Sequence, residues 1–270
     1  MHNQMNKTTA TTNENDLTVG QWVARYPQSA RVFESRGIDY CCGGKRTLEE
    51  ACGRLGLNAA ALRVDLGVVV REAPAIPETD WEQVSVGALI DHIESTHHQY
   101  IRAERPRLTA LAHKVARVHG SRHLELEELA VAVDRVFLEL EPHLEQEETV
   151  FFPACRKWEK AAIAGAPDPS LIEGVEGLEA EHVELGRILE TIRSLTHGFE
   201  PPHDACNSYL ALFQGLEQLE ADLHQHIHKE NNILHARLRL AGPNGNKIGT
   251  IVDAGKAEPG GSRPVTCCDV

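Results

Sequence analysis

The stretch HIHKENNIL, from His226 to Leu234, places two histidines and a glutamate among isoleucines and a leucine. His226 and Glu230 continue an apolar row that repeats in steps of three and four residues, whereas His224 and His228 fall off that row. Residues four apart lie on one face of a helix, so an imidazole and a carboxylate at this spacing can reach one ion together. We therefore interpret His224 and His228 as bystanders. The other members of the row are Tyr209, Phe213, Leu216, Leu219, Leu223 and Ile233.

A second stretch has the same arrangement. HLEQEETVF, from His143 to Phe151, matches HIHKENNIL as histidine, an apolar residue, two variable residues, glutamate, two variable residues and two apolar residues. His143 and Glu147 lie on the apolar row of Leu129, Val133, Val136, Leu140, Val150, Ala154 and Trp158. His182 lies on a third row, formed by Leu171, Val175, Leu178, Leu185, Leu189 and Ile192.

These rows predict the fold. Steps of three and four are typical of a helix in a bundle, not of the alternation of a strand. Four such segments lie between residues 81 and 240, separated by turns such as GAPDP and HGFEPPH. The first segment contributes Val86, Leu89, Ile90, Ile93, His97, Ile101, Leu108, Leu111 and Val115. The sequence therefore predicts an all-α protein built around an up-and-down four-helix bundle.

Composition divides the rest of the chain. We expect a disordered arm at residues 1–16 and a small helical domain at 17–72. The segment APAIPETD, residues 73–80, is the expected linker, because its prolines cannot continue a helix. The bundle follows at 81–240, and residues 241–270, rich in Gly and Pro, are expected to form a flexible tail.

Charge and cysteine content limit the partners. The chain has 270 residues with 40 acidic and 27 basic side chains, a net charge of −13, which argues against nucleic acid or an anionic membrane as partner and favours cations. It has no apolar run near the ~20 residues of a membrane span, and its polar N-terminus lacks a signal peptide, so we expect a cytoplasmic protein. The seven cysteines, including the pairs Cys41-Cys42 and Cys267-Cys268, do not resemble a secreted disulfide framework.

The polar residues on the apolar rows predict a metal site. A single histidine on an apolar face is usually a hydrogen-bonded core residue, and a lone glutamate can be solvated at a helix end. Three histidines and two glutamates at matching positions of three helices favour a metal, because buried carboxylates need compensating cations. There are more ligands here than one zinc ion uses. Two ions bridged by the two glutamates fit better, and imidazole with carboxylate suits iron, with manganese left open.

The first helical segment leaves its ligand open. Its row makes His97 the inward residue and His98 a flanking one, although Pro106 can kink the helix and change its phase. His119 lies near the end of the segment, where a metal ligand and a C-terminal cap are both compatible with the pattern. A ferritin-like site also remains open, since Glu94 and Glu179 each stand three residues before a histidine.

Several motifs together resemble a known family. They are DYCCGG at residues 39–44, followed by Thr47-Leu48, then DHI near Asp91, HLEQEE, EAEH and HIHKENN. The chain resembles the iron-sulfur cluster repair proteins, the di-iron, hemerythrin-like family also called repair of iron centres proteins. The similarity covers about residues 17–240.

The resemblance implies a centre of two non-haem iron ions held by five histidines and two bridging glutamates. Carried over by motif, these ligands are His98, His119, His143, Glu147, His182, His226 and Glu230. The family match thus favours His98 over His97. It also suggests a homodimer. The chain departs from the family pattern at Pro142, which precedes a ligand, at His235, where an aromatic residue is expected, and at the Cys267-Cys268 tail.

The N-terminal cysteine pair is the second candidate site. Cys41 and Cys42 precede two glycines and a helix whose Thr47 and Glu50 have the spacing of a capping box. A thiol near a helix N-terminus has a lowered pKa, and adjacent cysteines favour an open dithiol over a strained disulfide. The plainer alternative is a pair of small buried residues at a turn. With the family in view, we interpret the pair as accessory thiols for iron, nitric oxide or electron transfer.

These features favour a stress-response protein that restores iron-sulfur clusters damaged by nitric oxide or peroxide, by iron donation or NO chemistry. Its expected partners are damaged iron-sulfur proteins, with NO or O2 as small ligands. Reduction of nitric oxide to nitrous oxide at the same centre is an enzymatic alternative. A hemerythrin-like carrier or sensor of O2 or NO is a third hypothesis, although a carrier has no need of a dithiol domain.

Overall fold

The computed structural model describes residues 17–72, 79–161 and 167–241. The expected arm at 1–16, most of the expected linker and the tail from residue 242, with Cys267 and Cys268, lie outside these residues. Within the described ranges every regular element is helical, and the β-structure consists of one isolated bridge between Thr18 and Thr47. The prediction of an all-α fold is confirmed.

The N-terminal unit consists of four short helices. They are α1 (Val19–Arg25), α2 (Ser29–Ser35), α3 (Leu48–Leu55) and α4 (Ala59–Glu72). The expected capping box forms at α3, where the backbone N–H of Glu50 donates to the Thr47 hydroxyl and the N–H of Thr47 donates to the Glu50 carboxylate. Gly56 ends α3 in the left-handed conformation, at φ 66°, which a residue without Cβ adopts at little cost.

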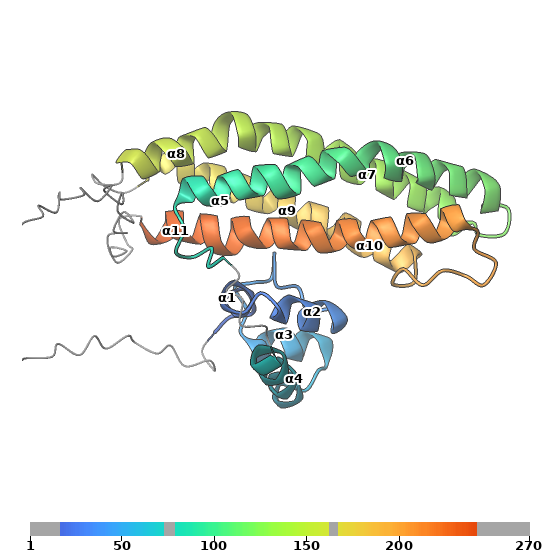
Figure 1. Ribbon diagram of the computed structural model, residues 1–270, viewed down its shortest axis with the longest axis horizontal. Helices are drawn as coiled ribbons and strands as arrows, with labels where there is room; N and C mark the ends of the chain where they lie inside the picture. The colour runs from blue at the N-terminus through green and yellow to red at the C-terminus, as the bar shows by residue number, and fades with distance from the viewer. Residues whose placement is uncertain (1–16, 73–78, 162–166, 242–270) are drawn as a thin grey trace, which may run out of the picture.

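The bundle consists of four long helical rods (Figure 1). Packing joins α6 to α7, α7 to α9, and α10 back to α6, as the predicted four-helix bundle requires. The first rod is α5 (Val86–His92), η2 (Ile93–His98) and α6 (Gln99–His119); the second is α7 (Glu125–Gln146), η3 (Glu147–Phe151) and α8 (Phe152–Ala161); the third is α9 (Pro169–Leu195); the fourth is α10 (Asn207–His228), η4 (Lys229–Leu234) and α11 (His235–Leu240).

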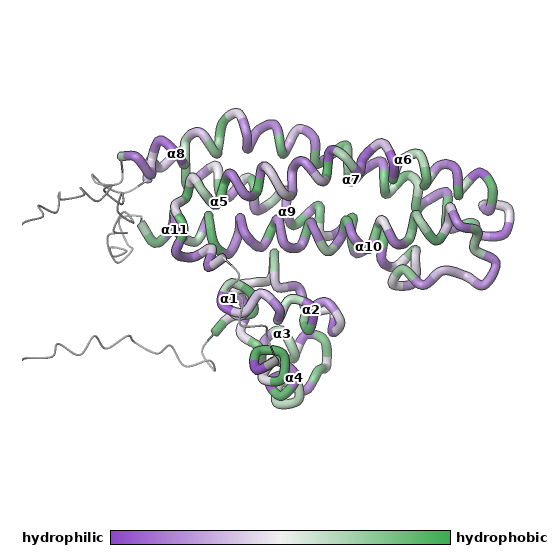
Figure 2. The backbone as a smooth tube through the Cα atoms, viewed as in Figure 1, coloured by the Kyte–Doolittle hydropathy of each residue, from purple (hydrophilic) through white to green (hydrophobic). Residues whose placement is uncertain are grey.

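Apolar residues gather on the inner faces of these rods, and Figure 2 shows apolar and polar residues alternating along each of them. The third predicted row is buried throughout, from Leu171 to Ile192. The second row is wrong at one position, because Val150 is 64% exposed and Phe151 is the buried residue. None of the helices in the described residues is long and apolar enough to cross a membrane.

Three of the four rods contain a π-helical turn: η2, η3 and η4. A π turn closes its hydrogen bonds over one more residue than an α turn, so each extra residue rotates the following side chains by ~100°. This rotation explains why a strict α-helical period misplaces Val150. Each of the three turns contains a polar residue of the rows: His97 in η2, Glu147 in η3 and Glu230 in η4.

The N-terminal unit docks on the fourth rod, beside α10 in Figure 1. The side-chain amide of Asn232 donates to the carbonyl oxygens of Tyr40, at 3.1 Å, and Cys41, at 3.0 Å. Gln225 donates to the Tyr40 hydroxyl at 2.8 Å. Gly44 allows this approach, since a Cβ there would lie 2.2 Å from Oδ1 of Asn232.

Candidate metal centre

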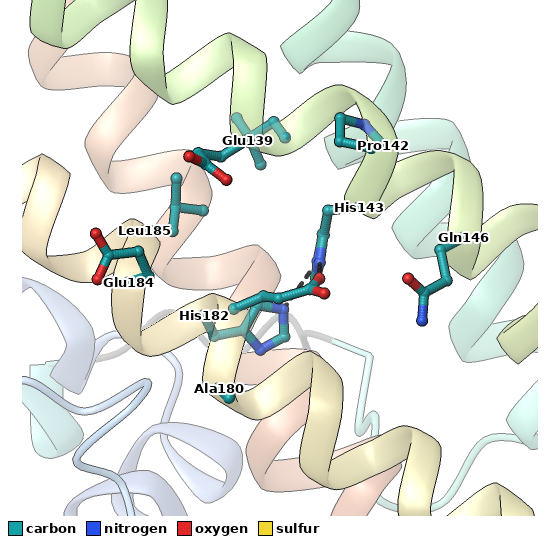
Figure 3. Close-up of a pocket in the computed structure, with 10 residues that line it drawn as sticks. Glu139, Pro142, His143, Gln146, Ala180, His182, Glu184 and Leu185 are labelled. Atoms are coloured by element: carbon teal, nitrogen blue, oxygen red, sulfur yellow. Dashed lines mark hydrogen bonds and ion pairs between the residues drawn. The ribbon is translucent and has the colours of Figure 1, made fainter.

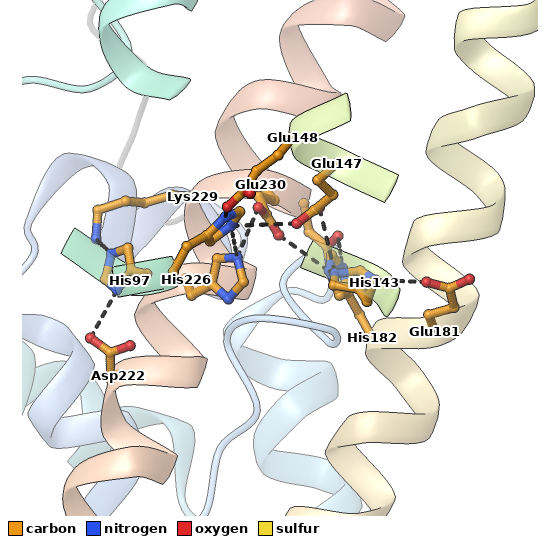
Figure 4. Close-up of polar contacts among 12 residues, drawn as sticks. His97, His143, Glu147, Glu148, Glu181, His182, Asp222, His226, Lys229 and Glu230 are labelled. Carbon is orange, nitrogen blue, oxygen red and sulfur yellow. Dashed lines mark hydrogen bonds and ion pairs between the residues drawn. The ribbon is translucent and has the colours of Figure 1, made fainter. Parts of the chain in front are cut away.

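Six polar residues from all four rods meet in the middle of the bundle (Figure 4). They form two groups of four, whose ligand atoms lie within 4.8 Å of one another, and both groups contain Glu147 and Glu230. None of the six side chains is more than 5% exposed. The first group adds His98 and His226, and the second adds His143 and His182.

The imidazole nitrogens of each group face each other. Nε2 of His98 lies 3.2 Å from Nε2 of His226, and Nε2 of His143 lies 3.1 Å from Nε2 of His182. Glu230 spans both groups, with Oε1 at 2.9 Å from His226 and Oε2 at 3.2 Å from His182. Glu147 likewise approaches both groups. Its Oε2 lies 3.5 Å from Nε2 of His98, and its Oε1 lies 3.5 Å from Nε2 of His143.

The charges of this cluster fit a bound cation. Neither oxygen of Glu147 accepts a hydrogen bond from any residue that the structure describes. Burial and the neighbouring charge of Glu230 raise the pKa of Glu147. Burial also opposes ionisation of Glu230, but the adjacent imidazoles of His226 and His182 hold its pKa well below the ordinary value. Two buried carboxylates of which three oxygens lack a hydrogen bond from the described residues are the environment that divalent cations stabilise.

A second layer of residues orients the imidazoles through Nδ1. Oε1 of Glu148 lies 2.8 Å from Nδ1 of His98, Oε2 of Glu181 lies 2.6 Å from that of His143, and Oδ1 of Asn231 lies 2.9 Å from that of His182. Such partners fix the tautomer, so that Nε2 points inward as a ligand. These three residues were not predicted from the sequence. Each is adjacent in sequence to a ligand candidate, inside the motifs HLEQEE, EAEH and HIHKENN, and that adjacency is the signal.

His97 and His98 are both buried, but only His98 belongs to the cluster. His97 faces the other way, with Nδ1 at 2.9 Å from Oδ1 of Asp222 and Nε2 at 3.2 Å from Nζ of Lys229. The apolar row, which makes His97 the inward residue, is therefore wrong here. The cause is the π turn η2, which ends at His98 and changes the phase of the helix.

His119 does not lie in the cluster. It ends the 21-residue α6. This helix begins just after His98, so the two residues are separated by ~30 Å of helix at ~1.5 Å per residue. Nε2 of His119 lies instead 3.2 Å from Sγ of Cys206. The structure thus corrects the expectation that His119 joins the other ligands.

The ferritin-like alternative fails on its carboxylates. Glu94 binds Arg156 at 3.0 Å, and Glu179 binds Arg239 and Lys45. Neither carboxylate belongs to a group that could hold a metal ion among the described residues. The expected bystander His228 is off the inward row but is not in solvent. It is 2% exposed, and its ring packs 5.6 Å from that of Tyr40 in the N-terminal unit.

The cysteine pair lies beside the cluster, but its electrostatics differ from the expectation. Cys42 Sγ lies 3.5 Å from the carbonyl oxygen of His182. The N–H groups of both cysteines donate to Oδ1 of Asp39, at 3.1 and 2.9 Å. The pair does not lie at a helix N-terminus, since α3 begins only at Leu48. Hydrogen bonding to Cys42, burial and the charge of Asp39 raise the pKa of Cys41 instead of lowering it. Asp39, Cys41 and Cys42 form a third group that could hold a metal ion.

A cavity of about 360 Å³ opens from the cluster to the surface (Figure 3). His143 and His182 lie at its inner end, and Pro142 forms part of its wall. Pro142 lies inside α7, and His143 beside it still belongs to the cluster. The other departure, His235, is buried and stacks on His182 with ring centres 6.3 Å apart, so it fills the aromatic position that the family pattern expects.

Comparison with known proteins agrees with this architecture. Residues 89–238 match the hemerythrin HHE cation-binding domain, and residues 15–69 match ScdA_N, a domain of unknown function. The iron-sulfur cluster repair protein YtfE of Yersinia pseudotuberculosis serotype IB is 34% identical over 220 residues, which are 82% of this chain and 95% of that protein. YtfE of Yersinia pestis strain Pestoides F is 33% identical over the same shares. The chain therefore belongs to the iron-sulfur cluster repair protein family, with a hemerythrin cation-binding domain behind an ScdA_N domain.

Proposed function

We propose that this chain is a di-iron protein that restores iron-sulfur clusters damaged by nitrosative or oxidative stress, acting on iron-sulfur proteins as its partners. The supporting observation is the pair of four-ligand groups that share Glu147 and Glu230. A shared carboxylate pair suits two adjacent ions, one for each group. The printed names of the relatives, iron-sulfur cluster repair proteins, supply the biological context.

The ligand types favour iron for these two positions. Four imidazoles and two carboxylates form a mixed set that suits iron, whereas structural zinc sites usually include cysteine. When bound, iron supplies redox chemistry and affinity for NO or O2. The protein holds the imidazoles through Glu148, Glu181 and Asn231, and it excludes water by burying all six ligands. Neutral imidazoles hold ferrous iron less tightly than an all-carboxylate cage, which favours a centre that releases iron.

The cavity offers a route for iron as cargo. Its inner end reaches His143 and His182, and the carboxylates of Glu139, Glu181 and Glu184 line its walls. Acidic side chains along an opening raise the local concentration of cations and favour their passage. The route thus connects the centre to solvent on the side of α7 and α9.

The test uses a cluster enzyme inactivated by NO. Adding the iron-loaded protein should restore its activity faster than the same amount of free ferrous iron and thiol. The variant Glu230→Gln, which removes a carboxylate common to both groups, should lose iron and restore no more than the free iron does. Recovery at the rate of free iron with the loaded wild-type protein would contradict the repair function.

A second candidate function is the reduction of nitric oxide to nitrous oxide. Two metal positions side by side favour it, because each can bind one NO molecule. Gas analysis during turnover decides this point. Consumption of NO without formation of nitrous oxide would eliminate the enzymatic function and leave the repair function intact.

The thiols support repair over simple O2 or NO carriage. Cys42 lies against the backbone of His182, so a thiol stands next to the metal-binding groups without belonging to either of them. We propose that Cys41 and Cys42 are accessory thiols for iron, NO or electrons. Reversible O2 binding without oxidation of the iron would instead favour a carrier or sensor.

The homodimer is a further part of the proposal. Leu124, Val131 and Leu138 form a row with a seven-residue step at α7, and they are 77%, 66% and 70% exposed. Such a row is the kind of face that a second helix covers. Sedimentation analysis should show a dimer that Val131→Glu dissociates, whereas Val118→Glu on α6 leaves it intact. A wild-type protein that is monomeric at micromolar concentration would contradict the proposed homodimer.

A further inference from the structure

A cysteine and a histidine meet at the end of the bundle that is remote from the metal centre. Cys206 is the N-cap residue of the 22-residue helix α10, and its side chain makes no capping hydrogen bond. Sγ of Cys206 lies 3.2 Å from Nε2 of His119. Of the cysteines that the structure describes, Cys206 is the exposed one; Cys41, Cys52 and Cys155 are buried and Cys42 is half-buried.

The histidine is held in a fixed orientation. His119 is 4% exposed, and its ring packs against Tyr209 with ring centres 5.3 Å apart. Its Nδ1 has no hydrogen-bond partner among the described residues, so the thiol of Cys206 is the polar group that Nε2 meets. A buried imidazole directed at an exposed thiol has the arrangement of a base and a nucleophile.

The acidic side chains near this pair have partners of their own. The carboxylate of Asp204 is bound by His123, at 3.1 Å, and by Arg122, at 3.4 Å, and Glu125 lies 3.2 Å from His123. Lys114 donates to Ser208 in the first turn of α10, which brings a positive charge to the same end of the helix. The N-terminus of a long helix adds a partial positive charge that stabilises an anion.

We propose that Cys206 is a nucleophilic thiol, activated by His119, that takes the nitroso group from low-molecular-weight S-nitrosothiols. The sulfur attacks the nitroso nitrogen, a new S–N bond forms on Cys206, and the S–N bond of the donor breaks. The donor leaves as a thiolate, and the thiol proton passes to Nε2 of His119 and then to that leaving thiolate. No atom is oxidised or reduced overall. Cys206 is exposed, so a small-molecule donor can approach it from solvent.

The reactivity of Cys206 stands on its own geometry, whereas the choice of an S-nitrosothiol as donor rests on the proposed role in nitrosative stress. Two measurements separate these parts. The first is the rate of iodoacetamide labelling of Cys206 in the full-length, iron-loaded protein, followed by peptide mass spectrometry. We expect a rate about tenfold above that of a synthetic peptide of residues 204–209, which has the thiol but lacks His119 and the helix. An equal rate would overturn the proposal.

The second measurement compares donors. S-Nitrosoglutathione should nitrosate Cys206 faster than it nitrosates the peptide, and Cys206→Ser should remove that product. If hydrogen peroxide modifies Cys206 faster than the peptide but the nitrosothiol does not, the assignment of the donor is wrong. Iron content and cluster recovery should be the same for Cys206→Ser and the wild-type protein. A failure of the proposal for Cys206 is therefore distinct from a failure of the repair function.

The role of the histidine has its own matched pair of variants. His119→Asn should lose most of the labelling rate in excess of that of the peptide. His123 packs against the same Tyr209 but does not touch the sulfur, so His123→Asn should retain most of that rate. The ratio of the wild-type labelling rate to that of His119→Asn should grow as the pH falls from about 8.5 to about 6.5. At lower pH fewer thiols lose their proton to solvent, so a base beside the sulfur has a larger effect on the rate. A ratio that is independent of pH would show that His119 acts only through packing. Circular dichroism checks that both variants are folded.

Discussion

Glu147 and Glu230 are the residues whose burial must be explained, since both side chains are 0% exposed. A buried carboxylate is stable only with a proton, a cationic partner or a metal. In the structure, Oε1 of Glu230 has a hydrogen bond with His226, whereas Oε2 of Glu230 and both oxygens of Glu147 have none from the described residues. Three unsatisfied carboxylate oxygens in one buried cluster favour the binding of positive charge.

The pH dependence of metal binding follows from His182. Burial alone lowers the pKa of an imidazole, but the hydrogen bond to Glu230 and the charges of Glu230 and Glu147 raise the pKa of His182 to about 9. The imidazole is therefore protonated in the metal-free protein below that pH, and a metal must displace the proton. The affinity for Co²⁺, measured by competition with a chelator, should rise roughly tenfold per pH unit between about 6.5 and 8.5. An affinity that is unchanged over this range would contradict the prediction.

The residues behind the ligands should control affinity as well. Glu181 orients His143 through Nδ1, whereas the nearby Glu184 binds Arg135 and Arg187 and touches no ligand. Glu181→Ala should weaken metal binding by about 10- to 100-fold, the usual effect of losing such a partner. Glu184→Ala, on the same helix and the same cavity, should leave the affinity within about twofold of the wild type. Equal losses in both variants would mean that the general charge of the cavity, not the orientation of His143, sets the affinity.

At the scale of the element, the π turns decide what the sequence could reveal. The α-helical period brought out five polar residues that the structure gathers: His143, Glu147, His182, His226 and Glu230. It failed at His97 and at Val150, and both errors fall within a π turn. Hydropathy records which residues are apolar but not where the backbone takes in one extra residue. Only the motif resemblance, which does not depend on helical phase, pointed to His98.

Shortening a π turn should separate the fold from metal binding. Val150 is an exposed residue of η3, and deleting it converts the π turn to an α turn without changing the phase of α8. The variant should keep its helical circular dichroism and lose metal, because Glu147 opens this turn and its side chain would be re-aimed. Deleting Lys157 in the regular helix α8 is the control; it shifts the half-buried Trp158 out of its contacts and should lower stability. Full metal content in the Val150 deletion would show that η3 is not needed for the centre.

At the scale of the whole molecule, two units are joined around the metal-binding groups. The ligands all come from the bundle, while the N-terminal unit adds Cys42 beside His182. The sequence predicted both units but not their contact. Periodicity is a local property, and nothing local pairs Asn232 with the backbone of Tyr40 and Cys41 across the chain. The same limit applies to His119, whose partner Cys206 lies on another helix.

Gly44 provides a way to separate the units without touching a ligand. A Cβ at Gly44 would lie 2.2 Å from Oδ1 of Asn232 and 2.6 Å from the carbonyl oxygen of Tyr40, and the backbone atom cannot easily move. Gly44→Ala should therefore weaken docking and raise the labelling rate of Cys42 at least about threefold, while metal content stays at the wild-type level.

The control for this substitution is Gly53→Ala, in the helix α3, where a Cβ would meet nothing within 4 Å. That variant should be more stable to unfolding by about 0.5–1 kcal/mol, because alanine favours the helix, and should label Cys42 at the wild-type rate. If cluster recovery falls in Gly44→Ala with iron fully retained, the thiols act only when docked on the bundle. If Cys42 labelling is equal in the two variants, the contact through Asn232 does not hold the units together, and the place of the dithiol beside His182 has another cause.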